Sequence, residues 1–333
     1  MALKLSFILP CYNVERYIAD CLDSLYAQDL ADDEFEVICV NDCSTDGTRD
    51  IVQKFAMKHP NLILVDHERN MTVGGARNTG LNRAKGEYIW FVDPDDMVKK
   101  GVAKELYEKA SGECLDLLMF NFETVDESQE PIKVNLAFVD SVVMSGQEFV
   151  VSFFSNRFSE LCIVWRGLFK KEFLEQQGLR FPNMRKGEDV SFLWKALLVA
   201  DRVDSVREVY YTYRRNPYSV THKRLDARVA FSERMLFANE IYEMLTRHDL
   251  SFKVVIRNDM ERTLLWCVNN NLNLIHQMTL KERSRYYDEI KNNLEIVCCL
   301  RAFMNRKQRC LFSIVEGRWL WLLKVMVMCL SLK

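Results

Sequence analysis

Three aspartates directly follow an apolar segment: residues 88–92 are all apolar or aromatic, and Asp93, Asp95 and Asp96 come next, with one proline between them. The apolar part predicts a strand buried on both faces, because such a strand shows no polar alternation. Three carboxylates this close repel one another unless a cation lies between them. Their oxygens suit Mg²⁺ or Mn²⁺. The segment therefore predicts a metal site, and the alternative is that Asp95 or Asp96 caps a helix beginning near residue 99.

The elements that must position these aspartates are indicated by the apolar pattern of the N-terminal region. Strands are predicted at residues 3–9, 36–40, 62–65 and 87–92, and helices at residues 14–27, 48–58 and 74–84. Regular alternation of strand and helix predicts a mostly parallel sheet with helices on its faces. Ligands of such open sheets bind beyond the carboxyl ends of the strands. Candidate site residues are therefore sought where each strand ends.

Polar residues occupy those positions after successive strands. Pro10, Tyr12 and Asn13 follow the first strand, and residues 41–47, which include Asp42, follow the second. The recurrence of polar clusters at strand ends predicts one shared pocket. The chain has neither G-x-G-x-x-G after its first strand nor G-x-x-x-x-G-K-[ST], so these two phosphate-binding motifs are absent. A bound nucleotide would instead have its phosphates held by the metal and by Arg77.

Composition sets the broad class of the protein. The 333 residues suffice for one large domain or two smaller ones, and the net charge of -2 gives no general attraction to nucleic acid, which is not expected as a partner. The eleven cysteines are odd in number, and Cys11, Cys39 and Cys43 lie in or beside predicted strands. They are expected to be reduced, which favours the cytosol. Neither a secretory signal nor a transmembrane segment is expected from the apolar runs.

Four motifs together resemble family 2 glycosyltransferases of the GT-A fold. They lie at residues 8–13, 40–48, 75–80 and 91–96, and a second block at residues 164–192 resembles the acceptor half of the same family. The resemblance implies an α/β, Rossmann-like domain with a mostly parallel sheet flanked by helices, followed by a mainly helical C-terminal region. It divides the chain into a nucleotide-sugar-binding half at residues 1–125, an acceptor-binding half at 126–222 and a helical region at 223–333.

The resemblance also implies roles on the donor side of the site. Tyr12 would flank the nucleobase, with Pro10 and Asn13 beside it, and Asp42 would accept a hydrogen bond from the uracil imide, since a carboxylate only accepts. Arg77 would lie near the diphosphate, where a permanent cation is useful. The alternatives are plain packing for Tyr12 and a solvated helix position for Arg77. The family often has glycine where this chain has Cys43.

The metal and the catalytic base follow from the same resemblance. Asp95 would be the main ligand of Mn²⁺ or Mg²⁺, Asp93 would contact the metal or ribose, and His222 is a further candidate near the metal. Asp189 would be the general base that removes the acceptor hydroxyl proton, with Glu188 as the second choice. The alternative for Glu188 and Asp189 is a pair of acids that favours a helix start.

The predicted function is metal-dependent, inverting transfer of a sugar to a hydroxyl of a glycan or lipid-linked glycan in surface polysaccharide synthesis. The expected donor is UDP-hexose or UDP-N-acetylhexosamine. Two alternatives stay open. A nucleotidyltransferase making an activated sugar would need a basic, glycine-rich loop after the first strand, which residues 10–13 are not. A non-catalytic, nucleotide-binding partner of another transferase would not need Asp95 and Asp189.

The C-terminal residues 301–333 form a basic, apolar tail. They contain seven Lys or Arg and one Glu, a local charge of +6, around a Trp-rich apolar run. Such a segment favours the surface of an anionic membrane, and the run is too short to span one. The protein is therefore expected in the cytoplasm, peripheral at the inner face of the cell membrane. The alternative is a terminal helix that docks on the protein core or on the partner in an oligomer.

Overall fold

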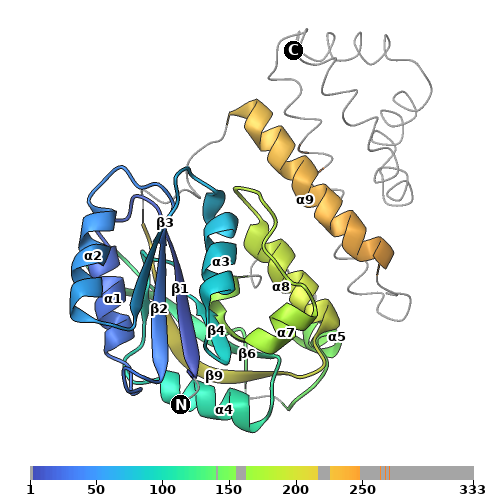
Figure 1. The fold of residues 1–333 in the computed structure, drawn as a ribbon. Helices are drawn as coiled ribbons and strands as arrows, with labels where there is room; N and C mark the ends of the chain where they lie inside the picture. The colour runs from blue at the N-terminus through green and yellow to red at the C-terminus, as the bar shows by residue number, and fades with distance from the viewer. Residues whose placement is uncertain are drawn as a thin grey trace. The chain divides into compact units, whose positions relative to one another are not determined.

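The computed structural model describes residues 3–139, 142–154, 163–216 and 226–247, together with Thr263, Cys267 and Asn270. The chain divides into two units, Met1–His222 and Lys223–Lys333. In the described part of the first unit, nine strands form one sheet in the order β3-β2-β1-β4-β8-β6-β9-β5, with β7 paired to β6. Figure 1 shows helices on both sides of this sheet. The α/β fold class expected from the sequence is confirmed.

The N-terminal half of the sheet is parallel, as the strand and helix alternation predicts. Its strands are β1 (Leu5–Cys11), β2 (Phe35–Asn41), β3 (Leu62–Asp66) and β4 (Tyr88–Phe91), and its helices are α1 (Ile18–Tyr26), α2 (Thr48–Lys58) and α3 (Thr72–Arg83). β1 pairs in parallel with both β2 and β4. Their carboxyl ends therefore meet at one edge of the sheet. Helix α1 begins later than predicted, because Tyr17 N–H donates to the carbonyl of Val14 in a turn.

The two faces of β1 pack on different helices. Phe7 and its alternate neighbours are buried with the apolar side of α1, including Leu22 and Leu25. Ile8 points to the other face, where it meets α3. A Cβ on Gly80 would lie 2.3 Å from Ile8 Cγ2, so α3 can approach β1 this closely only with glycine at this position. This close contact fixes α3, and with it Arg77, against the centre of the sheet.

The second half of the sheet is mixed, so the mostly parallel arrangement expected from the sequence applies only to the first half. Its strands are β5 (Met97–Val98), β6 (Leu117–Val125), β7 (Pro131–Asn135), β8 (Gly167–Lys170) and β9 (Val203–Arg214). β8 is antiparallel to both β4 and β6, while β9 is parallel to β6 and antiparallel to β5. β6 and β7 form an antiparallel hairpin, which needs no crossover helix.

No helix begins near residue 99, and the capping alternative for Asp95 and Asp96 is wrong. The chain forms the short strand β5 there, and helix α4 (Ala103–Gly112) begins later. The amides of Val102 and Ala103, at the start of α4, donate to the side-chain oxygen of Gln28. The aspartates are thus available for another purpose.

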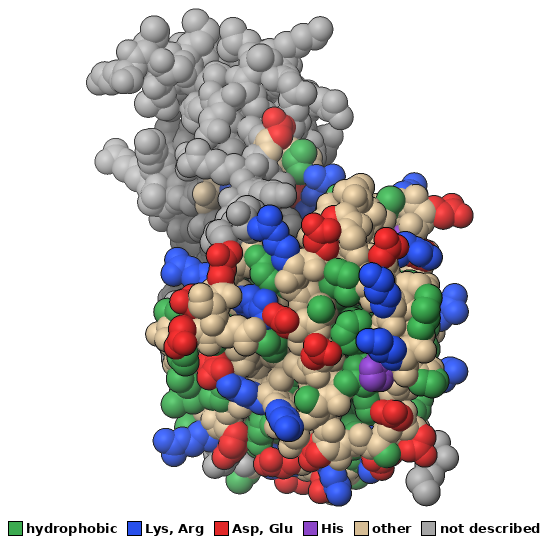
Figure 2. All heavy atoms as spheres, turned by 90° about the vertical axis from the view of Figure 1, so that its left-hand side faces the viewer, with side chains coloured by type: hydrophobic (Ala, Val, Ile, Leu, Met, Phe, Trp, Pro, Cys, Tyr) green, Lys and Arg blue, Asp and Glu red, His purple; other side chains and the backbone are tan. Residues whose placement is uncertain are grey.

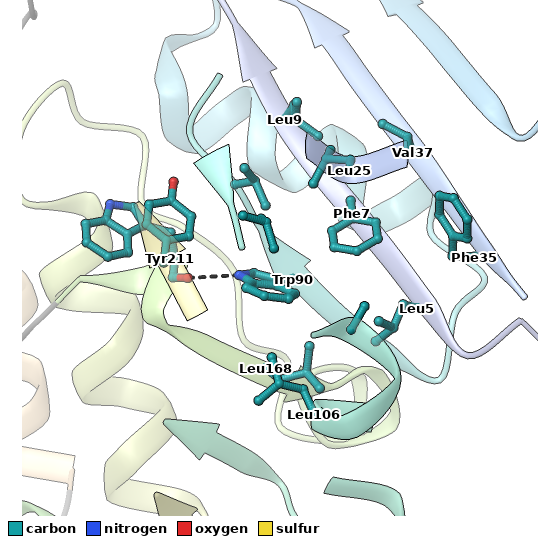
Figure 3. Close-up of a cluster of buried hydrophobic side chains, with 14 of the residues drawn as sticks. Leu5, Phe7, Leu9, Leu25, Phe35, Val37, Trp90, Leu106, Leu168 and Tyr211 are labelled. Atoms are coloured by element: carbon teal, nitrogen blue, oxygen red, sulfur yellow. Dashed lines mark hydrogen bonds between the residues drawn. The ribbon is translucent and has the colours of Figure 1, made fainter. Parts of the chain in front are cut away.

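Trp90 holds the strand that leads to the aspartates. Its indole N–H donates to the carbonyl of Trp165 at 2.9 Å, and its ring contacts Phe7 and Phe120 at centroid distances of 5.6 and 5.1 Å. Figure 3 shows Trp90 and Phe7 side by side in this buried cluster. Truncating a buried aromatic residue of this size to alanine costs about 3–5 kcal/mol. The apolar core therefore fixes the position at which β4 ends.

The remaining described helices belong to residues 146–199 of the first unit and to the second unit. They are α5 (Gly146–Phe149), the short helices Val150–Phe154 and Val164–Arg166, α7 (Lys171–Gln176) and α8 (Glu188–Val199), and in the second unit α9 (Ala227–Arg247). None of the helices in the described residues has the length and apolar character needed to cross a membrane. Six described cysteines, including Cys11, Cys39 and Cys43, carry free thiols. The tail at residues 301–333 lies outside the described residues.

The surface over α1 and α2 carries charges of both signs. Figure 2 shows Lys and Arg interspersed with Asp and Glu on this face. Such mixing is usual for a solvated surface.

Candidate active site

The loops that follow β1 and β2 are joined into one edge of the candidate site. Asn13 has a positive φ of 53°, and its side-chain oxygen accepts from the amide of Thr45 at 2.8 Å. Its own amide donates to the hydroxyl of Ser44. Asn13 therefore fastens the two loops to each other. Pro10 is buried within β1, and Tyr12, the residue before Asn13, is 43% exposed, so its ring is open to a ligand.

Cys43 occupies a backbone conformation that favours glycine. Its φ is 66°, in the left-handed region that side chains other than Asn and Asp seldom adopt. Glycine, which the resemblance leads one to expect here, would adopt this conformation without steric cost. The chain keeps the loop conformation with cysteine, and the thiol lies near the carbonyl of Glu68 at 3.9 Å.

Asp42 is buried at the end of β2, with only 3% of its side chain exposed. Its Oδ1 accepts from His67 Nδ1 and from the amide of Met71, both at 2.7 Å. No hydrogen bond to Oδ2 is present among the described residues. The carboxylate is therefore held by one oxygen, and the second oxygen accepts no hydrogen bond from the described residues.

The three aspartates after β4 have three different surroundings. Asp93 is ion-paired with Arg77 through Nη2 at 2.7 Å, and Asp95 accepts from Asn216 at 3.2 Å. Asp96 is fully enclosed, accepting from the hydroxyl of Tyr211 and from the backbone amide of Arg214, both at 2.8 Å. Asp93 and Asp95 thus lie at the site, while Asp96 anchors the turn to the end of β9.

Burial of these carboxyl groups changes how readily they ionise. Burial first, and then the charge of Asp93, raise the pKa of Asp95 to about 6. Burial and the charges of Asp95 and Asp93 raise the pKa of Asp96 well above its usual range. The described partners of Asp95 and Asp96 are neutral groups. Both carboxyl groups therefore release their protons less readily than an exposed aspartate does.

Glu188 and Asp189 begin helix α8, after Gly187 turns the chain with a φ of 88°. Glu188 is buried and paired with Nη1 of Arg77 at 2.9 Å, whereas Asp189 is half-buried and accepts from the amide of Val190. Burial first, then Asp189, raise the pKa of Glu188 to about 8, and Arg77 opposes this. Burial also raises the pKa of Asp189, again opposed by Arg77. Among the described residues, Arg77 forms an ion pair with Glu188 and not with Asp189.

Arg77 is the residue that joins the two halves of the site. Its guanidinium is 3% exposed and contacts Asp93 and Glu188 at the same time. Burial alone would lower its pKa, but Asp93 and Glu188 raise the pKa above the ordinary value. Its Nε is buried and has no partner among the described residues. The solvated helix position considered for Arg77 is therefore wrong.

The carboxylates at this edge suit a divalent cation in number and chemistry. Among the described residues, no three His, Cys, Asp or Glu side chains already converge as a metal shell. The groups that could hold an ion are Asp95, which accepts from Asn216, and Asp93, which is also paired with Arg77. Mg²⁺ and Mn²⁺ sites of transferases need one or two carboxylates when substrate phosphates complete the shell. The residues thus fit such an ion, while His222 lies outside the described residues.

Three residues at this edge escaped the sequence analysis, namely His67, Tyr211 and Asn216. His67 binds Asp42, Tyr211 binds Asp96, and Asn216 binds Asp95. Tyr211 and Asn216 lie more than 110 residues along the chain from their partners, so no local pattern points to them. His67 could have been found, because it follows β3 directly and so lies at the same edge of the sheet.

Comparisons with known proteins agree with this geometry. The family model described as glycosyl transferase family 2 matches residues 6–173, just over half of the chain. An uncharacterized glycosyltransferase of Bacillus subtilis, EpsJ, is 35% identical over 219 residues, covering 65% of this chain and 62% of its own length. The poly(ribitol-phosphate) beta-N-acetylglucosaminyltransferase TarS of Staphylococcus aureus is 30% identical over 213 residues, covering 63% of this chain and 35% of its own length.

A solved structure shares the fold. The crystal structure of S. aureus TarS 1–349 in complex with UDP-GlcNAc superposes with a TM-score of 0.69 at 24% identity, covering 95% of this chain and 88% of that one. The chain spans less than two thirds of the length of the two curated relatives. The family match, the shared fold and the acidic edge of the sheet agree: this chain belongs to glycosyl transferase family 2.

Proposed function

We propose that this chain transfers a sugar from a UDP-linked donor, a hexose or N-acetylhexosamine, to a hydroxyl group of a glycan or lipid-linked glycan during synthesis of a surface polysaccharide. The observation that carries the proposal is the bridge from Asp93 through Arg77 to Glu188, which joins the donor-side turn to the helix that bears the candidate base. Support for the donor comes from the TarS structure in complex with UDP-GlcNAc. The names of the relatives support a polymer as acceptor.

Asp42 and Tyr12 are the proposed nucleobase contacts. Oδ2 of Asp42 would accept the imide N–H of uracil, because Oδ1 already binds His67 and Met71. Tyr12 would cover the ring, in keeping with its exposure at the end of β1. Pro10 and Asn13 would support these contacts through the backbone, Asn13 by holding the two loops together. Cytosine presents an unprotonated ring nitrogen at the same position, so the acceptor oxygen disfavours it.

Asp95 is the proposed main ligand of Mn²⁺ or Mg²⁺, with Asp93 as the second carboxylate. When bound, such an ion neutralises charge on the leaving diphosphate as a Lewis acid. Asp96 would not bind the ion, because Tyr211 and Arg214 hold both of its oxygens. Arg77 keeps Asp93 in position and adds a positive charge near the donor. The role of His222 stays a prediction.

Asp189 is the proposed general base. It would take the proton from the acceptor hydroxyl as the oxygen attacks the anomeric carbon, so that the bond to UDP breaks on the opposite side and the configuration inverts. A pKa above the usual range keeps an aspartate a better proton acceptor, provided that it is ionised at the working pH. Glu188 is tied to Arg77 and would position Asp189 rather than take the proton.

The protein would work on the cytoplasmic side of the membrane, at its inner face. Support comes only from the basic, apolar composition of residues 301–333, which would bind anionic lipid. An oligomer contact through the same residues is the competing role. Flotation of the full chain with anionic and with neutral vesicles distinguishes the two.

Calorimetry with UDP tests the donor and metal proposals together. We expect UDP to bind more tightly with Mn²⁺ than with EDTA, and Asp95→Asn to remove most of that difference, whereas Asp126→Asn in the β6–β7 turn leaves it unchanged. UDP should also bind better than GDP. Equal UDP affinity with Mn²⁺ and with EDTA would contradict the metal role, and tighter GDP binding would overturn the donor assignment.

A further inference from the structure

His67 lies immediately after β3, beside the candidate nucleobase contact. Its backbone N–H donates to the carbonyl of Asn41 at 3.0 Å, which continues the parallel pairing of β2 and β3 by one residue. This places the imidazole next to Asp42, the residue after Asn41. The position follows from sheet register, so the backbone fixes where the imidazole lies.

Both ring nitrogens of His67 are engaged. Nδ1 lies 2.7 Å from Asp42 Oδ1, and Nε2 lies 2.9 Å from the hydroxyl oxygen of Thr79 in helix α3. Because the carboxylate can only accept, Nδ1 carries the hydrogen of the first bond. In the neutral ring Nε2 then accepts from the hydroxyl of Thr79. Two hydrogen bonds therefore run in one direction, from the Thr79 hydroxyl to His67 and from His67 to Asp42.

The hydrogen bond from His67 affects which oxygen of Asp42 can accept from a ligand. The hydrogen bond from His67 and the amide of Met71 both end at Oδ1. Two donors on one oxygen fix the rotation of the carboxylate. Oδ2 receives neither of these hydrogen bonds and keeps its capacity to accept one from a ligand. Without the donor from His67, the amide of Met71 alone would hold the group.

We infer that His67 is a positioning residue that sets the preference of this site for uracil over cytosine. The inference rests on the proposed binding of UDP at Asp42. His67 would not touch the base; it would hold Asp42 so that Oδ2 meets the imide N–H of uracil and repels the unprotonated ring nitrogen of cytosine. Thr79 fixes the ring in the orientation that makes this contact.

Two substitutions separate the contact with Asp42 from the contact with Thr79. In His67→Asn the amide nitrogen lies near the former position of Nδ1, so the donor to Asp42 is retained. In His67→Gln the amide lies near the former position of Nε2, so the contact with Thr79 is retained and the donor to Asp42 is lost. His59→Asn is the matched control, because His59 stacks on Tyr26 at a centroid distance of 3.7 Å and has no contact with Asp42.

The measurement is the ratio of UDP to CDP affinity, determined by calorimetry for each folded variant. A hydrogen bond to a charged group is worth about tenfold or more in an equilibrium constant. We expect His67→Gln to reduce the UDP to CDP ratio by about tenfold, while His67→Asn and His59→Asn stay near the wild-type ratio. A wild-type ratio retained in His67→Gln overturns the inference. A wild-type protein that does not prefer UDP contradicts the proposed function instead.

A second measurement needs no substitution. The chain has five histidines, so ¹⁵N labelling of histidine gives few side-chain signals. We expect the His67 ring to carry a proton on Nδ1, facing Asp42, and its signal to shift when UDP is added and to shift less with CDP. A His67 ring protonated only at Nε2, or a His67 signal that does not change with UDP, would overturn the inference. This holds even where the variants fail to fold.

Discussion

Arg77 and Glu188 form a buried ion pair, with Nη1 and Oε1 2.9 Å apart, although 111 residues separate them in the chain. The same guanidinium binds Asp93 through Nη2 at 2.7 Å. Arginine suits this position because its planar guanidinium presents Nη1 to one carboxylate and Nη2 to the other in a fixed geometry. One residue of helix α3 thus holds both the turn after β4 and the start of α8.

Replacing Arg77 should destabilise the domain. Removing one partner of a buried ion pair leaves the others uncompensated and costs about 3–5 kcal/mol. We expect Arg77→Met to lose that much in the free energy of unfolding, measured by chemical denaturation, and Arg77→Lys to lose less. Arg83→Met is the control, since Arg83 is exposed on the same helix. Equal stability of Arg77→Met and the wild type would contradict the buried role.

Asp189→Asn should slow transfer strongly without loss of donor binding. Asparagine keeps the size of the side chain and an oxygen that can accept from Val190 N–H, but cannot take a proton. General-base catalysis contributes about 10²–10⁴-fold, so we expect kcat to fall by that factor with UDP affinity unchanged. Asp201→Asn, after the other end of α8, is the control. A fully active Asp189→Asn variant would move the base elsewhere.

Glu188 should make stability depend on pH. Its pKa is raised to about 8 in the folded chain, mainly by burial, against about 4.3 in an unfolded one. The folded state then binds the proton of Glu188 more tightly than the unfolded state does, and this tighter binding stabilises the fold. The stabilisation is complete below about pH 4 and is lost as pH rises to about 8.

Glu188→Gln removes this titration. Between pH 5 and 8 we expect the wild type to lose stability relative to Glu188→Gln by at least about 1 kcal/mol, roughly one unit of pKa. Chemical denaturation of both proteins across this range measures the difference. Parallel pH profiles would show that Glu188 is ionised throughout, held so by Arg77.

Tyr211→Phe should loosen the turn that bears the aspartates. The hydroxyl donates to Asp96 Oδ2 at 2.8 Å and accepts from the amide of Asp93 at 3.1 Å. Losing it leaves two buried groups unsatisfied, which costs about 1–3 kcal/mol each. We expect weaker Mn²⁺-dependent binding of UDP in calorimetry. Tyr210→Phe, whose hydroxyl binds Glu105 instead, should leave that binding unchanged. Identical behaviour of the two variants would contradict a special role for Tyr211.

The first half of the fold could be predicted because its signals are local. Apolar runs such as residues 88–92 identify buried strands, and their alternation with helices fixes parallel order, so the polar residues at strand ends could be placed at one edge. Asp42 and Asp93 were found in this way. The second half lacks this regularity, since β8 inserts between β4 and β6 from a distant part of the chain.

The contacts that organise the site could not be predicted from the sequence. Arg77 was expected beside the diphosphate, but nothing in its sequence neighbourhood indicates that Glu188 will meet it. Asp96 looked equivalent to Asp95, and only the arrival of Tyr211 and Arg214 from β9 separates an anchoring aspartate from a candidate ligand. These distinctions arise from tertiary packing, which sequence spacing does not record.

The most direct test of the central claim is to measure nucleotide release from a panel of sugar donors by the full chain with Mn²⁺. The account predicts that UDP is released from UDP-hexose or UDP-N-acetylhexosamine, and that Asp95→Asn and Asp189→Asn each abolish this release. GDP- and CMP-linked sugars should not react. Release from GDP-sugars alone, or release of pyrophosphate from UTP and a sugar phosphate with no reaction of any UDP-sugar, would contradict it.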